Sequence, residues 1–301
     1  YMAFASEHGF DSVLAEGWNQ GWSDYGANAD GTALEMGVDD SYPDFDVNAV
    51  TEFGANRSNP VEMTMHNETS GNLGNYEDEI NNRDLFAEYR NAGIRSIKNG
   101  YVNDPGLYGN ADDLDELTHT HQSQRAGNHH REVMQAAAAN KQMLEIHEGI
   151  RPTGEIRTYP NVAAREVVKA QEYDGFGELG SSVGRDHHVT LPFTRMLAWP
   201  TSFQPGIFDI TFNEDDETGQ IQTTRAKQLA MYPTYLAGLQ MAADRIEAYI
   251  DSTLEVGEFV QAQSGDLDGM ITADQWRNAY GAHYVPFDPN REPGGATVTF
   301  T

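Results

Sequence analysis

The sequence contains no cysteine among its 301 residues, which excludes disulfides and thiolate chemistry and leaves the redox compartment unread. It also contains no run of about 18 apolar residues, so no membrane-spanning helix is predicted. Neither a G-x-G-x-x-G nor a P-loop pattern opens a predicted helix, which disfavours a nucleotide-binding sheet. A chain of this length is long enough to bury a sizeable core, in one large barrel or in two domains.

Basic residues are scarce. Only 19 Lys and Arg stand against 47 Asp and Glu, which gives a net charge of −28. Such a surface repels nucleic-acid phosphates and anionic lipid, so neither is expected as a partner. Two explanations remain, a cationic or calcium-rich partner and adaptation to concentrated salt. We favour salt adaptation, because the acidic charge is spread along the whole chain and lysine is almost absent.

Short apolar segments alternate with helical segments along the chain, which is typical of a parallel sheet built from βαβ units. The predicted strands are 11–16, 61–66, 94–98, 142–147 and 188–193, and the predicted helices are 46–56, 79–92, 122–140 and 221–244. The stretch YMAFASEHGF indicates the end of a helix, with Gly9 as its C-cap. No strand precedes this helix, so we expect an N-terminal portion to be missing.

Polar residues follow four consecutive predicted strands, where each strand ends. They are Glu16 and Trp18 after the first, His66 and Glu68 after the second, Lys98 after the third, and His147 and Glu148 after the fourth. This placement is typical of a barrel whose active face lies at the C-terminal strand ends. We therefore predict a (β/α)8 TIM-type barrel over residues 1–255 that lacks its first strand. Residues 256–301 are predicted to be a C-terminal tail or the start of a small β unit.

Several of these residues are carboxylates that would repel one another in a shared pocket unless a cation lay among them. Hard oxygen ligands in a chain without cysteine favour calcium over zinc. Paired carboxylates beside aromatic side chains such as Trp18 also suit glycoside hydrolysis. For any single glutamate, however, solvated surface charge is the simpler interpretation. His66 and His147 are expected to bind sugar hydroxyls or to orient a neighbouring carboxylate, and a purely structural role is the alternative.

Other motifs carry less chemistry. His129 and His130 are predicted on the surface of a helix, and His187 and His188 in a structural role at the start of a strand. The acidic segment 103–120 is expected to be an inserted surface loop. Asp266 and Asp268 resemble part of an EF-hand loop, but Gln275 replaces the bidentate glutamate that such a loop needs.

A family resemblance is carried by motifs in a fixed order over roughly residues 1–255. They are EHGFDSVLAEGWNQGW, YPDFDV, MHNETS, IKNGYV, HEGIRPTGEIRTYPN, PFTRMLAWPTSFQPGIFD and QLAMYPTYLAGLQMAAD. In this order the chain resembles the catalytic barrel of glycoside hydrolase family 97, the SusB-type calcium-dependent α-glucosidases and α-galactosidases. The motif LAWP departs from the usual Gly-Gly-Pro, so Trp199 is expected to reshape the pocket wall.

The resemblance also indicates a subgroup. Inverting relatives have glutamates at the positions of Glu68 and Glu148, whereas retaining relatives have Gly at the second position and an Asp nucleophile at the end of the strand matching 94–98. Here that strand is followed by Asn99 and Gly100, so the chain resembles the inverting subgroup, in a salt-adapted, haloarchaeal-like form. Inversion needs a base that activates water rather than a nucleophile in contact with the sugar.

The resemblance implies roles for individual residues. Glu172 matches the general acid, and Glu68 and Glu148 match the two glutamates that act as base. Glu148, Glu166 and Glu172 match ligands of Ca²⁺. Substrate-binding positions are matched by His66, His147, Lys98 and Trp18. The predicted substrate is an α-linked oligosaccharide, and a secreted or cell-envelope location is expected.

Three other interpretations stay open. The first is a non-catalytic calcium- and sugar-binding remnant, and the second is an α-galactosidase. The third is a metal-dependent sugar isomerase on the same barrel, which is disfavoured because the sequence lacks a His/Asp/Glu set suited to two divalent metals.

Overall fold

The computed structural model describes residues 1–22, 35–69, 72–102, 121–175, 183–210 and 221–250. The chain divides into two compact units, Tyr1–Arg165 and Glu166–Thr301. Each unit is considered by itself below. The predicted domain boundary between residues 255 and 256 lies outside the described residues and stays a prediction.

The first unit is built around a five-stranded sheet with the strand order β1-β2-β3-β4-β5. Its strands are β1 (Ser12–Ala15), β2 (Glu62–Glu68), β3 (Ser96–Gly100), β4 (Met143–His147) and β5 (Val162–Glu166). The pairs β1–β2, β2–β3 and β3–β4 are parallel, and each neighbour in the sheet is also the neighbour in sequence. This confirms an α/β fold with a parallel sheet and the first four predicted strands. Closure into an eight-stranded barrel stays a prediction.

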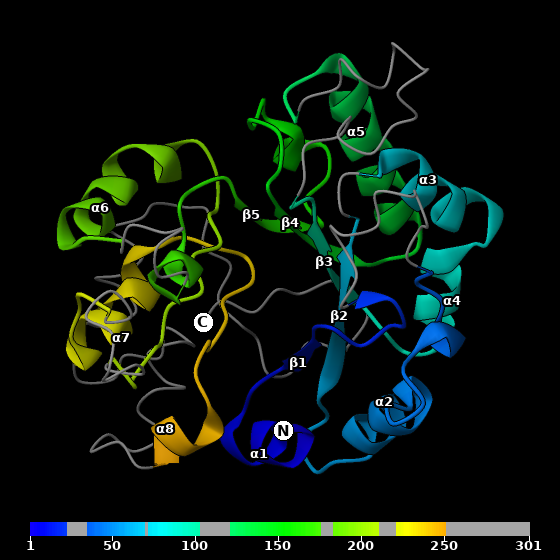
Figure 1. The fold of residues 1–301 in the computed structure, drawn as a ribbon, viewed down its shortest axis with the longest axis horizontal. Helices are drawn as coiled ribbons and strands as arrows, with labels where there is room; N and C mark the ends of the chain where they lie inside the picture. Colours follow the sequence, from blue (N-terminus) through cyan, green and yellow to red (C-terminus); the bar gives the residue numbers. More distant parts are fainter. Residues whose placement is uncertain (23–34, 70–71, 103–120, 176–182, 211–220, 251–301) are drawn as a thin grey trace. The chain divides into compact units, whose positions relative to one another are not determined.

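The described helices of the first unit are α1 (Met2–His8), α2 (Val47–Ala55), α3 (Leu73–Asn82), α4 (Leu85–Asn91) and α5 (Gln124–Ala139), with 3-10 turns at Val38–Asp40 and Glu155–Arg157. Helices connect the first four strands of this unit, and α2, α3, α4 and α5 lie along one side of the sheet (Figure 1). Side chains cap several of them: Asp46 accepts a hydrogen bond from the Ala49 N–H, and Ser123 accepts one from the Ala126 N–H. Gly9 ends α1 with a φ of 79°, as predicted.

The predicted helix over 79–92 is wrong in its extent, because two helices occupy this part of the chain. α3 starts earlier, at Leu73, and ends at Asn82. The chain then passes through Asp84, whose φ of 54° lies in the left-handed region and interrupts the helical hydrogen bonds, before α4 begins at Leu85.

The two faces of the sheet carry different side chains, because successive residues of a strand point to opposite sides. Met63 and Met65 of β2, Ile97 of β3 and Leu144 and Ile146 of β4 share one face and are at most 1 % exposed. The opposite face is polar, although it is also largely buried. Its members are Thr64, His66 and Glu68 of β2, Ser96 and Lys98 of β3, and Glu145 and His147 of β4.

The second unit corrects two predictions. Residues 188–193, predicted as a strand, lie in helix α6 (Arg185–Thr190) and in a 3-10 turn (Leu191–Phe193). His188 and Leu191 are buried three residues apart while Val189 is exposed, which is the period of a helix and not of a strand. Pro192 also has no N–H to donate to a sheet.

The predicted helix 221–244 is shorter than expected. α7 covers Arg225–Thr234, starts behind the capping hydroxyl of Thr224, and ends one residue after Pro233. The remaining described elements of this unit are a 3-10 turn at Gln171–Gly175, another at Arg195–Leu197, and α8 (Ile246–Ile250). A small core unites Ala170, Val183, Leu191, Phe203, Met231 and Tyr235.

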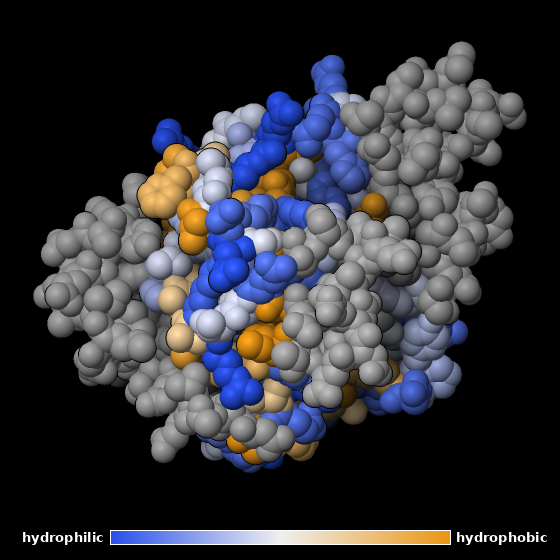
Figure 2. All heavy atoms as spheres, turned by 60° about the vertical axis from the view of Figure 1, so that its left-hand side comes forward, coloured by the Kyte–Doolittle hydropathy of each residue, from blue (hydrophilic) through white to orange (hydrophobic). Residues whose placement is uncertain are grey.

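Hydrophilic residues cover much of the described surface on the face drawn in Figure 2, with smaller hydrophobic areas between them. Exposed apolar side chains of the second unit include Val189, Phe193 and Leu197. Across the described ranges, every helix is too short or too polar to cross a lipid bilayer.

Candidate active site

The C-terminal end of β2 contributes two of the predicted site residues to the polar face of the sheet. His66 is 4 % exposed and Glu68 is 6 % exposed. Because they are two residues apart on a strand, both side chains point the same way, and His66 Nε2 lies 3.6 Å from Glu68 Oε2. The histidine and the carboxylate that the sequence places at one strand end are therefore neighbours in space.

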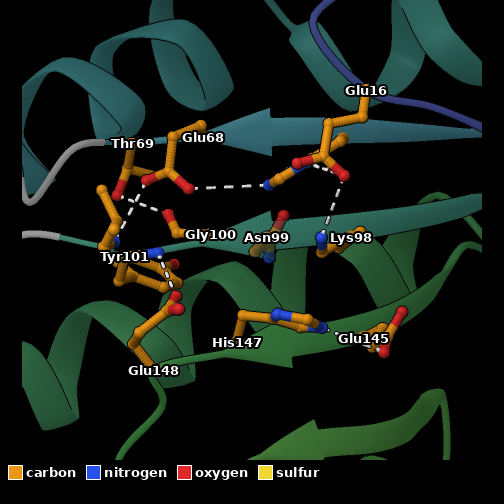
Figure 3. A network of polar contacts seen from close by, with 12 residues as sticks. Glu16, Glu68, Thr69, Lys98, Asn99, Gly100, Tyr101, Glu145, His147 and Glu148 are labelled. Atoms are coloured by element: carbon orange, nitrogen blue, oxygen red, sulfur yellow. Dashed lines mark hydrogen bonds and ion pairs between the residues drawn. The ribbon is translucent and has the colours of Figure 1, made fainter. Parts of the chain in front are cut away.

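Backbone N–H groups after β3 hold the two carboxylates that were predicted to act as base. The N–H of Tyr101 donates to Glu148 Oε2 at 2.9 Å, and the N–H of Val102 donates to Glu68 Oε1 at 3.2 Å. β3 lies between β2 and β4 in the sheet, so consecutive N–H groups reach a carboxylate on either side. The chain leaving β3 thus connects Glu68 with Glu148 (Figure 3).

Glu148 itself follows β4 in an unfavourable backbone conformation. Its φ is 45°, in the left-handed region that glycine adopts readily and other residues adopt at a cost of about 1–2 kcal/mol. Non-glycine residues in this region cluster at functional sites, where the surrounding structure holds them. The strain at Glu148 is consistent with selection for its carboxylate rather than for stability.

Gly100, the last residue of β3, makes room for this arrangement. It pairs with Glu68 across the sheet. A Cβ atom at residue 100 would lie 1.9 Å from Glu68 Oε2 and 2.7 Å from His66 Nε2. Any larger residue would have to displace both side chains, so the glycine keeps the Glu68 carboxylate at the centre of the strand ends.

Lys98 lies beside His66 in the register of β2 and β3, and a carboxylate binds both. Glu16 Oε2 is 3.3 Å from Lys98 Nζ and 3.4 Å from His66 Nδ1. Burial opposes the charge on Glu16, but the hydrogen bonds and charges of His66 and Lys98 outweigh it and lower the pKa of Glu16 to about 2. The sequence predicts Glu16 at a strand end but not as a site residue, because its position opposite the buried side chains of His66 and Lys98 is visible only in the structure.

His147 also has a carboxylate partner that the sequence analysis missed. Its Nε2 lies 3.2 Å from Glu145 Oε1, and Glu145 is fully buried. Glu145 and His147 are two residues apart on β4, so both side chains face the polar side of the sheet. Glu145 also pairs with Lys98 in the register of β3 and β4. The sequence did contain a signal for this pair, because Glu145 and His147 are polar residues two positions apart in a strand that is otherwise mostly apolar.

Three potential metal ligands meet at the ends of β4 and β5. His147, Glu148 and Glu166 each offer a ligand atom, and these atoms all lie within 4.8 Å of one another. Glu166 is the last residue of β5, a strand that the sequence analysis missed. Two carboxylates provide hard oxygen ligands, which fit Ca²⁺. Glu172, which was also predicted as a ligand, is an exposed residue of the 3-10 turn Gln171–Gly175 in the second unit, and its part in binding the ion stays a prediction.

Trp18 is buried rather than open to solvent. It is 3 % exposed, its indole N–H donates to the carbonyl of His66 at 2.8 Å, and its ring meets Tyr89 edge-on. Trp18 therefore supports the backbone of β2 at His66. A second aromatic residue, Trp22, meets the His66 ring edge-on with 5.0 Å between the centroids.

Two predictions about histidines are wrong. His129 and His130 lie in α5 as predicted, but they are buried at 0 % and 2 % exposure instead of lying on the surface. His188 does not begin a strand and is buried in α6. Trp199 is also buried, and its predicted effect on the pocket wall stays a prediction. The predicted loop 103–120 and the residues Asp266 and Asp268 lie outside the described residues.

Comparisons with known proteins show what this chain is similar to. The sequence profile of glycoside hydrolase 97 matches residues 1–168. A solved glycoside hydrolase family 97 enzyme from Pseudoalteromonas sp. strain K8, as a variant in complex with panose, is 38 % identical with a TM-score of 0.75. The same enzyme in complex with acarbose gives the same values. In both cases the match covers 87 % of this chain and 38 % of the solved chain, so this chain spans well under half the length of these relatives.

A more distant likeness concerns the fold alone. The crystal structure of a beta-arabinopyranosidase is 16 % identical over 87 % of this chain and 37 % of its own, with a TM-score of 0.58. The family profile, by contrast, covers more than half of the present sequence and includes His66, Glu68, Lys98, Glu148 and Glu166. The chain belongs to glycoside hydrolase family 97.

Proposed function

We propose that this chain is the catalytic part of an inverting, calcium-dependent α-glucosidase that hydrolyses α-linked oligosaccharides. The observation that carries the proposal is the pair of carboxylates Glu68 and Glu148, held by consecutive N–H groups at the end of β3. Two carboxylates fixed by neighbouring peptide groups at the end of one strand can share the task of removing a proton from an attacking water. The solved relatives in complex with panose and acarbose support an oligosaccharide substrate.

Gly100 supports the inverting assignment. A retaining glycosidase needs a carboxylate that attacks the anomeric carbon, and retaining relatives are expected to carry it at the end of this strand. Residue 100 has no side chain, and the space that one would fill is taken by Glu68 Oε2. This contact supports the proposed role of Glu68 as a base.

Glu172 is proposed as the general acid, which protonates the leaving oxygen while the base activates water on the opposite side of the sugar. Lys98 and His66, together with His147, are proposed to bind the hydroxyls of the sugar. Trp18 contributes by supporting the backbone at His66. The proposed salt adaptation of the surface would leave the roles of His66, Glu68 and Lys98 unchanged, because these three residues are buried on the polar face of the sheet.

The residues at the ends of β4 and β5 fit the proposed Ca²⁺. Glu148 and Glu166, with the expected participation of Glu172, would hold the ion, and His147 lies within reach of the same group. When bound, the cation would neutralise the carboxylates and polarise the site. Chelation of calcium is therefore expected to abolish turnover, and added Ca²⁺ is expected to restore it and to raise the midpoint of thermal unfolding.

Proton NMR of the first sugar released tests the mechanism. An α-linked substrate such as maltose is expected to release the β-anomer first, and release of the α-anomer would reject the inverting assignment. Parallel assays with aryl α-glucosides and aryl α-galactosides separate the proposed glucosidase from the α-galactosidase. Calorimetric titration with maltose tests the third possibility, a non-catalytic sugar-binding remnant. Such a remnant would bind maltose without hydrolysing it, and Glu172→Gln would leave this binding unchanged.

A further inference from the structure

A buried polar chain connects α3, α5 and the end of β3. The Arg125 guanidinium contacts both oxygens of the Glu77 carboxylate, one of them at 2.6 Å. His129 Nδ1 lies 2.8 Å from Glu77 Oε1, and His129 Nε2 lies 2.9 Å from the hydroxyl of Tyr101. The side chains of Arg125 and Glu77 are 34 % and 20 % exposed, whereas His129 is 0 % and Tyr101 is 1 % exposed, so this chain leads from near the surface into the interior of the first unit.

The direction of each hydrogen bond follows from the chemistry of the groups. Burial opposes the charge on Glu77, but the hydrogen bonds from His129 and Arg125 and the positive charge of Arg125 prevail and lower the pKa of Glu77 to about 2. Burial lowers the pKa of His129 and so favours its neutral imidazole. An ionised carboxylate only accepts hydrogen bonds, so His129 Nδ1 donates to it. In the neutral imidazole Nε2 is then the acceptor, and the hydroxyl of Tyr101 donates to it. Glu77 thus sets the tautomer that anchors the ring of Tyr101.

Tyr101 is the residue whose own N–H donates to Glu148, and the next N–H along the chain, that of Val102, donates to Glu68. Anchoring the Tyr101 side chain therefore fixes the peptide groups that hold both carboxylates. The hydroxyl of Tyr101 thus bonds to His129 on α5. Its backbone N–H bonds to Glu148, which follows β4 (Figure 3).

We propose that Tyr101 and His129, oriented by Glu77, are positioning residues that set the placement of Glu148 and Glu68. This inference rests on the proposed function, because it assumes that these two carboxylates act together on water. Neither Tyr101 nor His129 is expected to touch the substrate. Their effect would pass through the backbone at residues 101 and 102, and misplacement of a reacting group by about 1 Å can lower a rate by about 100-fold.

Steady-state kinetics on maltose with the full chain and Ca²⁺ test this proposal. Tyr101→Phe and His129→Leu each remove the bond between the hydroxyl and Nε2, and each is expected to lower kcat about tenfold with little change in KM, because the base acts in the transition state. His129→Gln can keep an amide group near the position of Nε2 and is expected to recover most of the rate. The double variant is expected to lose no more than either single variant, because both break one bond.

Thr51→Val is the matched control. It removes another buried hydroxyl of the first unit, one whose only role shown is a bond to the Val47 carbonyl within α2. It is expected to cost similar stability and to leave kcat unchanged. A wild-type kcat in folded Tyr101→Phe, or a loss in Thr51→Val equal to that in Tyr101→Phe, would overturn the proposal.

Crystal structures of the wild-type protein and of Tyr101→Phe provide a readout that needs no activity. The proposal expects the N–H of residue 101 to lose its contact with Glu148, or the Glu148 side chain to take more than one conformation. Unchanged positions of Glu148 and Glu68 in the variant would overturn it. If the wild-type protein hydrolysed nothing, the proposed function would fail, and these structures alone would decide whether Tyr101 positions the carboxylates.

Discussion

The two faces of strands β2, β3 and β4 are almost equally buried, yet they are built from different chemistry. One face presents Met65, Ile97, Leu144 and other apolar side chains that are at most 1 % exposed. The other presents a histidine, a lysine and carboxylates that are also buried, at up to 7 % exposure. Apolar burial stabilises the fold, whereas buried charge stabilises it only when each group has partners. The ionisable side chains of these strands thus share one face, whereas the other face is apolar apart from the buried amides of Asn67 and Asn99 at the strand ends.

Removal of one carboxylate from the polar face should give the largest effect. Glu68→Gln keeps the size of the side chain and an acceptor for the Val102 N–H, but it removes the proposed base. We expect kcat to fall by about 10²–10⁴-fold, the range typical of general base catalysis. Glu52→Gln, on the exposed side of α2, is the control and should leave kcat unchanged. Normal turnover in Glu68→Gln would show that the polar face does not carry the catalytic base.

Truncation on the apolar face should act on stability instead. Leu144→Ala removes a fully buried side chain of β4 and is expected to lower the free energy of unfolding by about 2–5 kcal/mol. The measurement is urea unfolding followed by circular dichroism. Leu197→Ala, at a side chain that is 76 % exposed, should change it by less than about 0.5 kcal/mol. A stable Leu144→Ala protein would show that this face is not the source of stability.

The backbone of Glu148 tests whether chemistry is kept at a cost in stability. Glu148→Gly and Glu148→Ala both lose the carboxylate and its hydrogen bond with Tyr101, so they differ only in the ease of reaching a φ of 45°. The glycine variant is expected to be more stable than the alanine variant by about 1 kcal/mol, and both are expected to be inactive. Thermal unfolding of the pair measures the difference, and equal stability would argue against strain at this residue.

Acid should produce the smallest effect, through Glu16. The partners His66 and Lys98 lower its pKa from 4.5 to about 2, so the folded protein binds fewer protons than the unfolded chain between these values. This contribution to stability is therefore present above about pH 4.5 and is lost as the pH falls toward about 2. Urea midpoints of the wild type and Glu16→Gln are expected to differ at about pH 6 and to converge near about pH 2. Glu52→Gln should show no such convergence, and a gap that is constant with pH would exclude this role for Glu16.

The part of the fold that the sequence predicted best is the repeating part. Four strands and helix α5 were identified because their apolar residues recur over enough positions to reveal a period. β5 was missed because its last two residues are Arg165 and Glu166, charged side chains that the structure buries. The prediction of a strand over residues 188–193 is wrong because six residues are too few to distinguish the period of a helix from that of a strand. Pro192, which cannot donate a hydrogen bond to a sheet, is the residue that argues against a strand.

The site was predicted in part for the same reason. His66, Glu68, Lys98, His147 and Glu148 stand at strand ends, and strand ends of a parallel sheet come together whatever their distance in sequence. Glu16 and Glu145 were not selected, because their importance lies in contacts with Lys98, His66 and His147 that no spacing reveals. Burial of His129 was likewise hidden, since nothing in the sequence shows that α5 turns this residue toward Tyr101.

By itself, the sequence determined that this chain forms an α/β protein with polar groups at the ends of parallel strands, because alternation and strand length are local properties. The tertiary structure decided which of those groups meet. It alone placed Glu68 in the space left by Gly100, and it joined Tyr101 to both Glu148 and His129. Distances of this kind depend on register and packing between segments far apart in the chain, and a single residue of shift would turn each side chain to the opposite face.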